Sequence, residues 1–205
     1  MTLREFIELL DDSADPVQVA SATFGDLAGV ANELGELVDA ADMARQLGRA
    51  QAIRVPDVEP MVWPLVSRPG HYDIVLNAYD PDRFERLRAD GYITPHRHHF
   101  SFASTVLNGG LAHFLFDNDG GLDDPSLRPR SQEFVGRAGQ LLLDPADYHC
   151  VLAPRRLTAT LMVRGAPVHA NPFLGDGSYC MTQFAADRAM LLDALATARS
   201  AGTRL

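Results

Sequence analysis

The sequence contains little cysteine and little positive charge, and both shortages limit what the protein can do. Only two of its 205 residues are cysteines, Cys150 and Cys180, too few for the disulfide framework of a small secreted protein. Lysine and arginine total 18 against 27 acidic residues, which gives a formal charge of −9. Because nucleic acids and anionic membranes attract clustered positive charge, this balance argues against both as main partners.

Long hydrophobic runs are also missing. No apolar stretch approaches the roughly 18 residues needed to span a bilayer. The first residues, "MTLREFIELLDD", have neither the basic start nor the uninterrupted apolar stretch of a secretory signal. Together with the scarcity of cysteine, this predicts a reduced, cytoplasmic protein.

The first quarter of the chain has the spacing of helices. Thr2 and Glu5 form a capping box, and Asp15-Pro16 is a cap followed by a proline in the first turn. Apolar residues then recur at intervals of three and four. We therefore expect a helical layer over residues 1–54. The four prolines of residues 55–70 deny helix and predict an extended connector.

From residue 71 the pattern changes to short segments rich in β-branched and aromatic residues, separated by Gly, Pro, Asp and Asn. These segments are "HYDIVLNAY", "HFSFASTVL", "LAHFLFD", "GQLLLD" and "LTATLMVRG". Such strands with turn signals between them predict a β sandwich or barrel over residues 71–175, with a hairpin at Asn108-Gly109-Gly110. Residues 176–205 return to helical spacing and are expected to pack on the barrel as a strand and a C-terminal helix.

Three histidines occur within four positions, at His96, His98 and His99. Side chains alternate faces along a strand, so His96 and His98 would point the same way and His99 the other. Two imidazoles on one face can chelate a single metal ion. The best third ligand is His149, which follows a proline turn and begins a later strand.

These residues resemble the two motifs of the cupin superfamily, which are small double-sheet jelly-roll barrels that hold a metal ion inside. The first motif is a glycine, His-x-His, three or four intervening residues followed by a glutamate, and a second glycine. It matches Gly91, His96, His98, Ala103 and Gly110, with Ala103 in place of the glutamate. The second motif, Gly, Pro-x-Gly and His, matches Gly139, Pro145 and His149, with Asp147 in place of its middle glycine. The resemblance covers residues 70 to 170 and implies a mainly β fold, a cupin double-stranded β-helix (jelly-roll barrel), with N-terminal helices and a C-terminal helix.

The missing glutamate is not replaced nearby, because no Asp or Glu occurs from His96 to Leu115. The ligand set would then be three neutral imidazoles, His96, His98 and His149. This is similar to the three-histidine non-haem iron branch of the superfamily, whose best-known members are the thiol dioxygenases such as cysteine dioxygenase. The resemblance implies Fe(II) as the cofactor, and imidazole ligands also suit Zn, Ni or Mn.

Two arginines are candidates for binding an anionic substrate. Alternation sends Thr160, Met162 and Arg164 to one face, where Arg164 would clamp a carboxylate if that face is the barrel interior. Arg68 precedes the first strand, in a region where thiol dioxygenases often supply such an arginine. The stretch "TLMVRG" lacks the histidine and tyrosine of the cysteine dioxygenase relay, so cysteine specificity is not supported.

Several alternatives stay open at this stage. A bulge that shifts the register would exchange His98 for His99. Asp147 either joins the site, as a fourth ligand or a partner of His149, or is an ordinary turn residue. Cys150 should face away from the site. The remaining histidines have no ligand spacing and are interpreted as structural or exposed: His71, His113 and His169.

The functional prediction is a mononuclear non-haem Fe(II) oxygenase or dioxygenase. It would oxidise a small, anionic metabolite with dioxygen and without an organic cofactor. The alternatives are a non-oxidative metal cupin, an isomerase or lyase with Zn or Mn, and a cupin that binds a small molecule without catalysis. Barrels of this kind often pair through a sheet face, which would give a homodimer.

Overall fold

The computed structural model describes residues 1–27, 30, 33–34, 61–82, 85, 95–121, 124–152, 156–168, 192–193 and 195–197. In chain order the elements are α1 (Leu3–Asp11), α2 (Pro16–Thr23), the 3-10 turn η1 (Phe24–Asp26), β1 (Met61–Arg68), β2 (Tyr72–Tyr79), β3 (Phe102–Asn108), β4 (Gly110–Asn118), β5 (Leu127–Gly136), β6 (Gln140–Leu143), β7 (Tyr148–Leu152) and β8 (Thr158–Gly165).

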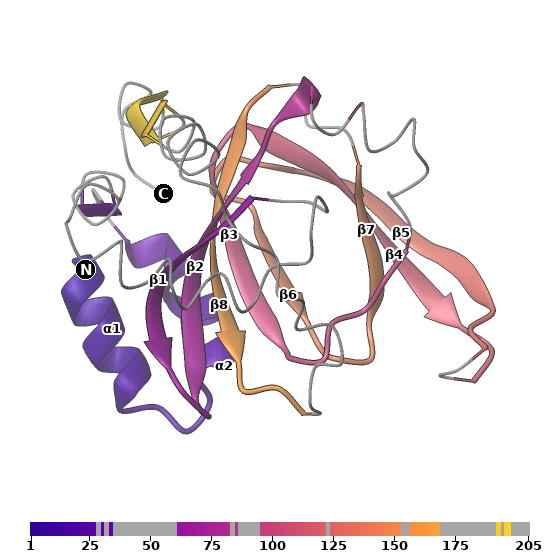
Figure 1. Cartoon of the computed structure of the whole chain (residues 1–205), viewed down its shortest axis with the longest axis horizontal. Helices are drawn as coiled ribbons and strands as arrows, with labels where there is room; N and C mark the ends of the chain where they lie inside the picture. The colour runs from indigo at the N-terminus through magenta and orange to yellow at the C-terminus, as the bar shows by residue number, and fades with distance from the viewer. Residues whose placement is uncertain are drawn as a thin grey trace, which may run out of the picture.

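The strands form two antiparallel sheets that face each other (Figure 1). The larger sheet has the order β1-β2-β8-β3-β6 and the smaller one β5-β4-β7. Strands that are distant in sequence lie side by side, because β8 pairs with both β2 and β3. The predicted fold class is confirmed: the protein is mainly β, a two-sheet antiparallel jelly roll with helices at its ends. The predicted domain limits stay predictions.

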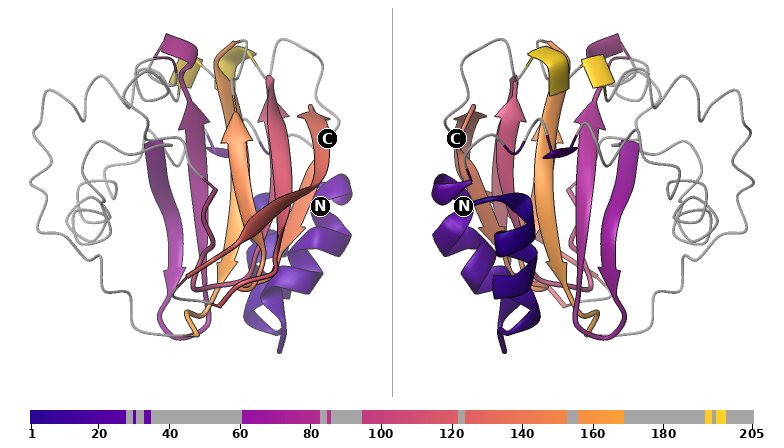
Figure 2. Two further views of the ribbon diagram at one scale, coloured as in Figure 1. Left: turned by 90° about the vertical axis from the view of Figure 1, so that its right-hand side faces the viewer. Right: turned by 90° about the vertical axis from the view of Figure 1, so that its left-hand side faces the viewer.

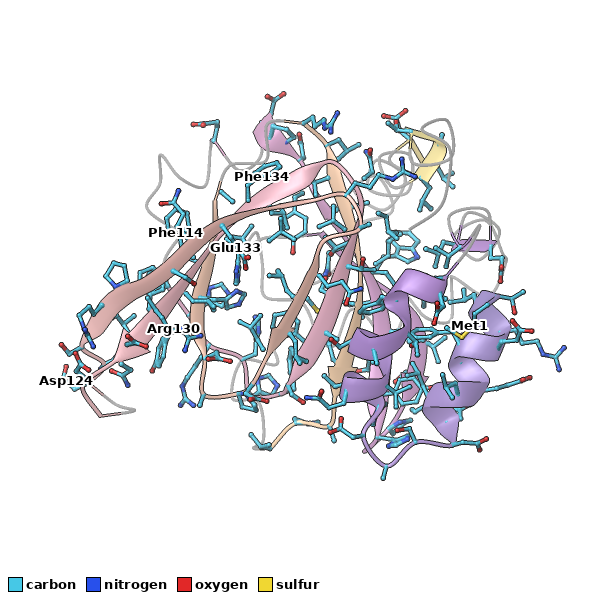
Figure 3. All side chains as sticks on the ribbon, turned by 180° about the vertical axis from the view of Figure 1, so that it is seen from behind. Met1, Phe114, Asp124, Arg130, Glu133 and Phe134 are labelled. Carbon is cyan, nitrogen blue, oxygen red and sulfur yellow. The ribbon has the colours of Figure 1, made fainter. Side chains whose placement is uncertain are left out.

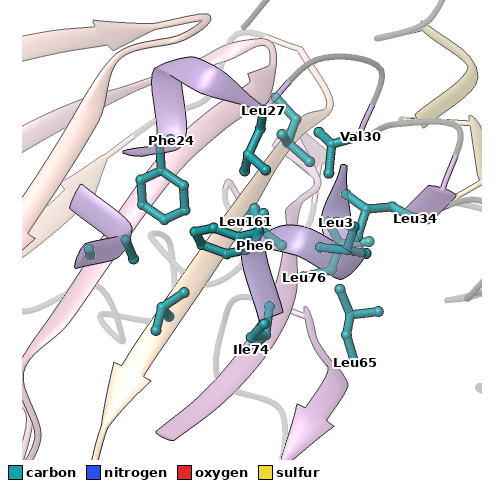
Figure 4. Close-up of a cluster of buried hydrophobic side chains, with 14 of the residues drawn as sticks. Leu3, Phe6, Phe24, Leu27, Val30, Leu34, Leu65, Ile74, Leu76 and Leu161 are labelled. Atoms are coloured by element: carbon teal, nitrogen blue, oxygen red, sulfur yellow. The ribbon is translucent and has the colours of Figure 1, made fainter. Parts of the chain in front are cut away.

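The N-terminal helices begin where their caps predict. Thr2 and Glu5 exchange the two hydrogen bonds of a capping box, and Asp15 caps α2 ahead of Pro16. Helix α1 buries one apolar face, and Figure 4 shows that face meeting residues of the larger sheet. The burial of this face fixes the helical layer on the outside of the sheet (Figure 2, right).

The larger sheet therefore has two buried faces with different roles. Ile74 and Leu76 of β2 belong to the cluster that contains the helices. Val75, between them, belongs to a second cluster with Phe102 and Met162. Because successive side chains of a strand point to opposite faces, the first cluster joins helices to sheet and the second fills the barrel interior. The interior side of the sheet is the one that can form a site.

Two strands lie where the apolar pattern did not predict them. Residues 61–68, expected as part of a proline-rich connector, form edge strand β1, which pairs with β2. Proline is tolerated there because an edge strand leaves one side unpaired, and the register shifts between Pro64 and Val66. Strand β5 is polar along most of its length because it is also an edge strand and is mostly exposed.

The predicted hairpin turn joins β3 and β4. Gly109 has a φ of +82°, a region that favours glycine, and a Cβ added there would clash with Thr158.

Near the C-terminus, residues 192–193 and 195–197 are helical, and Leu195 is fully buried in the helical cluster. None of the helices in the described residues combines the length and apolar character that crossing a bilayer requires.

Candidate metal centre

His96 and His149 meet through a two-residue bridge between the segment before β3 and strand β7. The backbone amide of each donates to the carbonyl of the other, at 2.9 Å from His96 and 2.8 Å from His149. Directly opposed residues of an antiparallel pair place their side chains on the same side. The two imidazole rings accordingly lie 4.6 Å apart, centre to centre.

His98 joins them although it lies in no regular strand. Its Nε2 is 3.0 Å from the Nε2 of His149, and its ring centre is 5.1 Å from that of His96. One ring nitrogen from each of the three histidines lies within 4.8 Å of the others. The structure thus brings together the three histidines that the sequence selected, and it selects His98 over His99.

The spacing of these nitrogens fits a metal ion. Imidazole nitrogens bind first-row metals at about 2.1 Å, so two of them at right angles around one ion lie about 3.0 Å apart. The His98–His149 nitrogen distance has that value. The three histidines can therefore hold a divalent cation, and His96, the exposed member, would be its ligand nearest to solvent.

The protonation states of the histidine rings also favour metal binding. Burial, followed by the neighbouring charges of His96 and Arg164, lowers the pKa of His98 to about 3. Burial and the adjacent histidines lower the pKa of His149 to about 2. Both rings are therefore neutral at pH 7, with a lone pair available for a metal ion.

Aromatic side chains rather than a carboxylate complete the surroundings. Phe100 stacks on His98 with ring centres 5.0 Å apart. Phe102 meets His98 edge-on at 5.2 Å and lies 5.7 Å from His149. Among the residues that the structure describes, no acidic group lies close enough to join the three histidines.

The position of the missing glutamate needs a correction. Ala103 was matched to it, but Ala103 is fully buried in the cluster between the helices and the larger sheet. Phe102 faces the barrel interior and contacts two of the histidines. Phe102 follows His98 after three intervening residues, so the shorter spacing of the motif that the sequence resembles matches this phenylalanine rather than Ala103.

Arg164 lies inside the barrel beside the histidines. Its cross-strand partners are Asp73 on β2 and Phe102 on β3, and its guanidinium carbon lies 5.3 Å from the centre of the Phe100 ring. The side chain is half-buried, but its Nε is fully buried without a hydrogen-bond partner. Burial lowers the pKa of Arg164, and the charge of Asp73 opposes the shift. A desolvated cation beside a metal site suits an anionic ligand.

Arg68 is placed elsewhere. Its Nε and one terminal nitrogen donate to the two carboxylate oxygens of Asp11 at 2.8 and 2.9 Å, and its cross-strand neighbour Tyr72 belongs to the helical cluster. Arg68 therefore ties α1 to the outer face of the larger sheet. This geometry does not support the predicted substrate contact, and we leave Arg68 out of the candidate site.

The other candidates have ordinary surroundings. Asp147 accepts a hydrogen bond from the backbone amide of Asp144 at 2.9 Å and one from Arg130 at 3.2 Å, which makes it a turn residue. Cys150 is buried and free and lies outside the histidine group. His169 and Cys180 lie outside the described residues.

The residue that the sequence reasoning missed is His113. It is almost fully buried (1% exposed), and its Nε2 lies 3.2 Å from the Nδ1 of His149. The lack of ligand spacing along the chain predicts a structural or exposed histidine, and the burial of His113 agrees with a structural role. Its position near the middle of a predicted apolar strand, as an isolated polar group, is the signal that could have found it.

Comparisons with solved structures give distant similarities. No protein-family model matches the sequence, and no curated protein matches it. Among solved structures, a conserved protein of unknown function from Streptococcus pyogenes is 16% identical with a TM-score of 0.35, over 56% of this chain and 80% of that one. A cupin superfamily protein from Desulfitobacterium hafniense is 9% identical with a TM-score of 0.36, over 55% and 83% of the two chains.

HppE, solved with cobalt(II) and its substrate, is 13% identical with a TM-score of 0.35, over 54% of this chain and 56% of HppE. These structural neighbours thus include cupin superfamily proteins. At such identities and scores, these structures say nothing about the chemistry of the site, which must be argued from the residues of this chain.

Proposed function

We propose that the protein is a mononuclear non-haem iron(II) oxygenase of the three-histidine cupin type, acting on a small anionic metabolite. The observation that carries the proposal is the grouping of three imidazole nitrogens within 4.8 Å, with Arg164 beside them, whose buried Nε has no hydrogen-bond partner. Neutral imidazoles leave the charge of a divalent cation uncancelled. The site would then be strongly positive and would attract an anion that can also bind the metal.

Each residue has a role in this proposal. His96, His98 and His149 would hold the ion. When bound there, ferrous iron supplies electrons and open coordination positions for dioxygen and substrate. Arg164 would hold a carboxylate or similar anionic group of the substrate by paired hydrogen bonds. Phe100 and Phe102 would keep water away from the reacting groups, which strengthens the electrostatic interactions among them.

The test begins with the metal content of protein purified without chelators. The metal-free protein is then reconstituted anaerobically with iron(II), and oxygen consumption is followed with a panel of small acids and thiols. We expect about one iron per chain and oxygen uptake that depends on one class of anionic substrate.

A matched pair of variants identifies the site. His98→Ala should lose the metal and the oxygen uptake. His99→Ala, one position along the chain and outside the histidine group, should keep both. Zinc or manganese without oxygen uptake would instead favour the isomerase or lyase alternative. Equal metal content in the His98→Ala variant and the wild type would refute the metal centre.

A further inference from the structure

A row of three polar side chains runs from the candidate ligand His149 to the edge of the smaller sheet. His113 on β4 lies between His149 on β7 and Glu133 on β5, which is directly opposite His113 across the strand pair. The Nδ1 of His113 is 3.5 Å from a carboxylate oxygen of Glu133. Figure 3 labels Glu133 on β5 together with its chain neighbour Phe134, which points to the opposite face of the strand.

The chemistry of the two ends determines how protons are arranged along this row. Carboxylate oxygens accept hydrogen bonds, so this arrangement favours a proton on the Nδ1 of His113, facing Glu133. A neutral imidazole has one N–H, which leaves the Nε2 of His113 as an acceptor. The Nδ1 of His149 must then be the donor in the 3.2 Å contact between the two rings. As a result, the Nε2 of His149 carries a lone pair on the side that faces His96 and His98.

We propose that Glu133 and His113 are positioning residues that hold His149 as its Nδ1–H tautomer, with Nε2 ready to bind a metal ion. The inference rests on the proposed metal centre and adds to it a specific pair of supporting residues. Partners of this kind fix the orientation of a ligand ring and raise its basicity.

Two features of the surroundings support a role beyond packing. The Nδ1 of His113 is buried and forms no well-shaped hydrogen bond, and Glu133 is the acceptor beside it. Glu133 is 56% exposed, so its side chain has the freedom to shorten the 3.5 Å contact. Contacts of this type are often long until the ligand is bound.

The tautomer can be measured without any metal. In metal-free wild-type protein, nitrogen NMR of the histidine rings should find His149 mainly as the Nδ1–H form. The same form should persist in His113→Gln, whose amide oxygen still accepts from His149. In His113→Leu the preference should disappear. A predominant Nε2–H form of His149 in the wild type would overturn the proposal.

Metal affinity provides the second measurement, with cobalt(II) as the probe in competition titrations. His113→Leu should weaken binding by about 10- to 100-fold, and His113→Gln should recover most of that loss. Glu133→Ala changes a mostly exposed side chain that the fold tolerates, so it remains informative if His113→Leu does not fold. It should weaken binding by roughly three- to tenfold, and unchanged affinity in Glu133→Ala would overturn the role of the carboxylate.

The two proposals fail in different ways. If the wild type shows the expected tautomer but binds no cobalt(II), the proposed metal centre is wrong and the hydrogen-bonded row is supported as a structural feature. If the wild type binds cobalt(II) and the His113 and Glu133 variants bind it equally well, the metal centre is supported and the positioning role is refuted.

Discussion

Replacing Arg164 by methionine should make the metal-free protein more stable. The guanidinium has a buried Nε without a partner, and a buried donor left without a hydrogen bond costs about 1–3 kcal/mol. Asp73 lies across the strand pair and partly compensates the charge, so we take the lower part of that range. Methionine keeps most of the length and apolar contact of the side chain. We therefore expect a gain of about 1–2 kcal/mol.

For a domain of this size, 1 kcal/mol corresponds to about 2–4 °C in Tm. Arg164→Met should therefore melt roughly 2–8 °C above the wild type in calorimetry of the metal-free protein. Arg156→Met is the matched control, because Arg156 is exposed just ahead of the same strand. An exposed substitution should change stability by no more than about 0.5 kcal/mol.

Adding a small carboxylate then tests whether Arg164 binds anions. A ligand that binds only the folded protein raises Tm with concentration, so acetate and larger carboxylates should stabilise the wild type and Arg156→Met but not Arg164→Met. A Tm of Arg164→Met below that of the wild type would mean that the guanidinium is not an uncompensated charge. Equal stabilisation of all three proteins would mean that the anion binds elsewhere.

Three further substitutions test other parts of the structure. Ala103→Glu would bury an unpaired carboxylate between the helices and the larger sheet and should cost several kcal/mol in urea unfolding; unchanged stability would contradict the placement of Ala103. The hydrogen bonds from Arg68 and Tyr72 lower the pKa of Asp11 from 3.8 to about 2, so their contribution is present above about pH 4 and is lost as the pH falls towards 2. The Tm difference between wild type and Asp11→Asn should shrink over that interval, and a constant difference would refute the assignment. Gly109→Ala places a Cβ against Thr158 at a positive φ and should destabilise by at least about 1 kcal/mol, measured by chemical unfolding; a neutral effect would count against this turn.

The sequence predicted the strands that carry an apolar pattern between turn residues. Strands β2, β3, β4, β6 and β8 coincide with apolar segments bounded by turn residues. Strand β1 was missed because Pro64 suggested a connector, and β5 was missed because its exposed side chains give no apolar pattern. Edge strands are stabilised by backbone pairing to one neighbour, and local composition reports that pairing poorly.

The candidate site divides in a similar way. His96 and His98 were selected by their short spacing along the chain, and His149 by its place after a proline turn at the start of a later strand. Ala103 was misplaced because one residue of register moves a side chain to the other face of a strand. The partners of Arg68 and His113, which are Asp11 and His149, could not be predicted because they are close only in the folded chain.

The bridge between His96 and His149 also has a mechanical consequence. His149 belongs to the smaller sheet, whereas His98 lies shortly before β3 of the larger one. An ion bound by all three histidines would act as a cross-link between the two layers of the jelly roll. Loading and losing the metal would then stiffen and loosen the whole barrel, so that resistance to heat and to proteolysis would report the occupancy of the site.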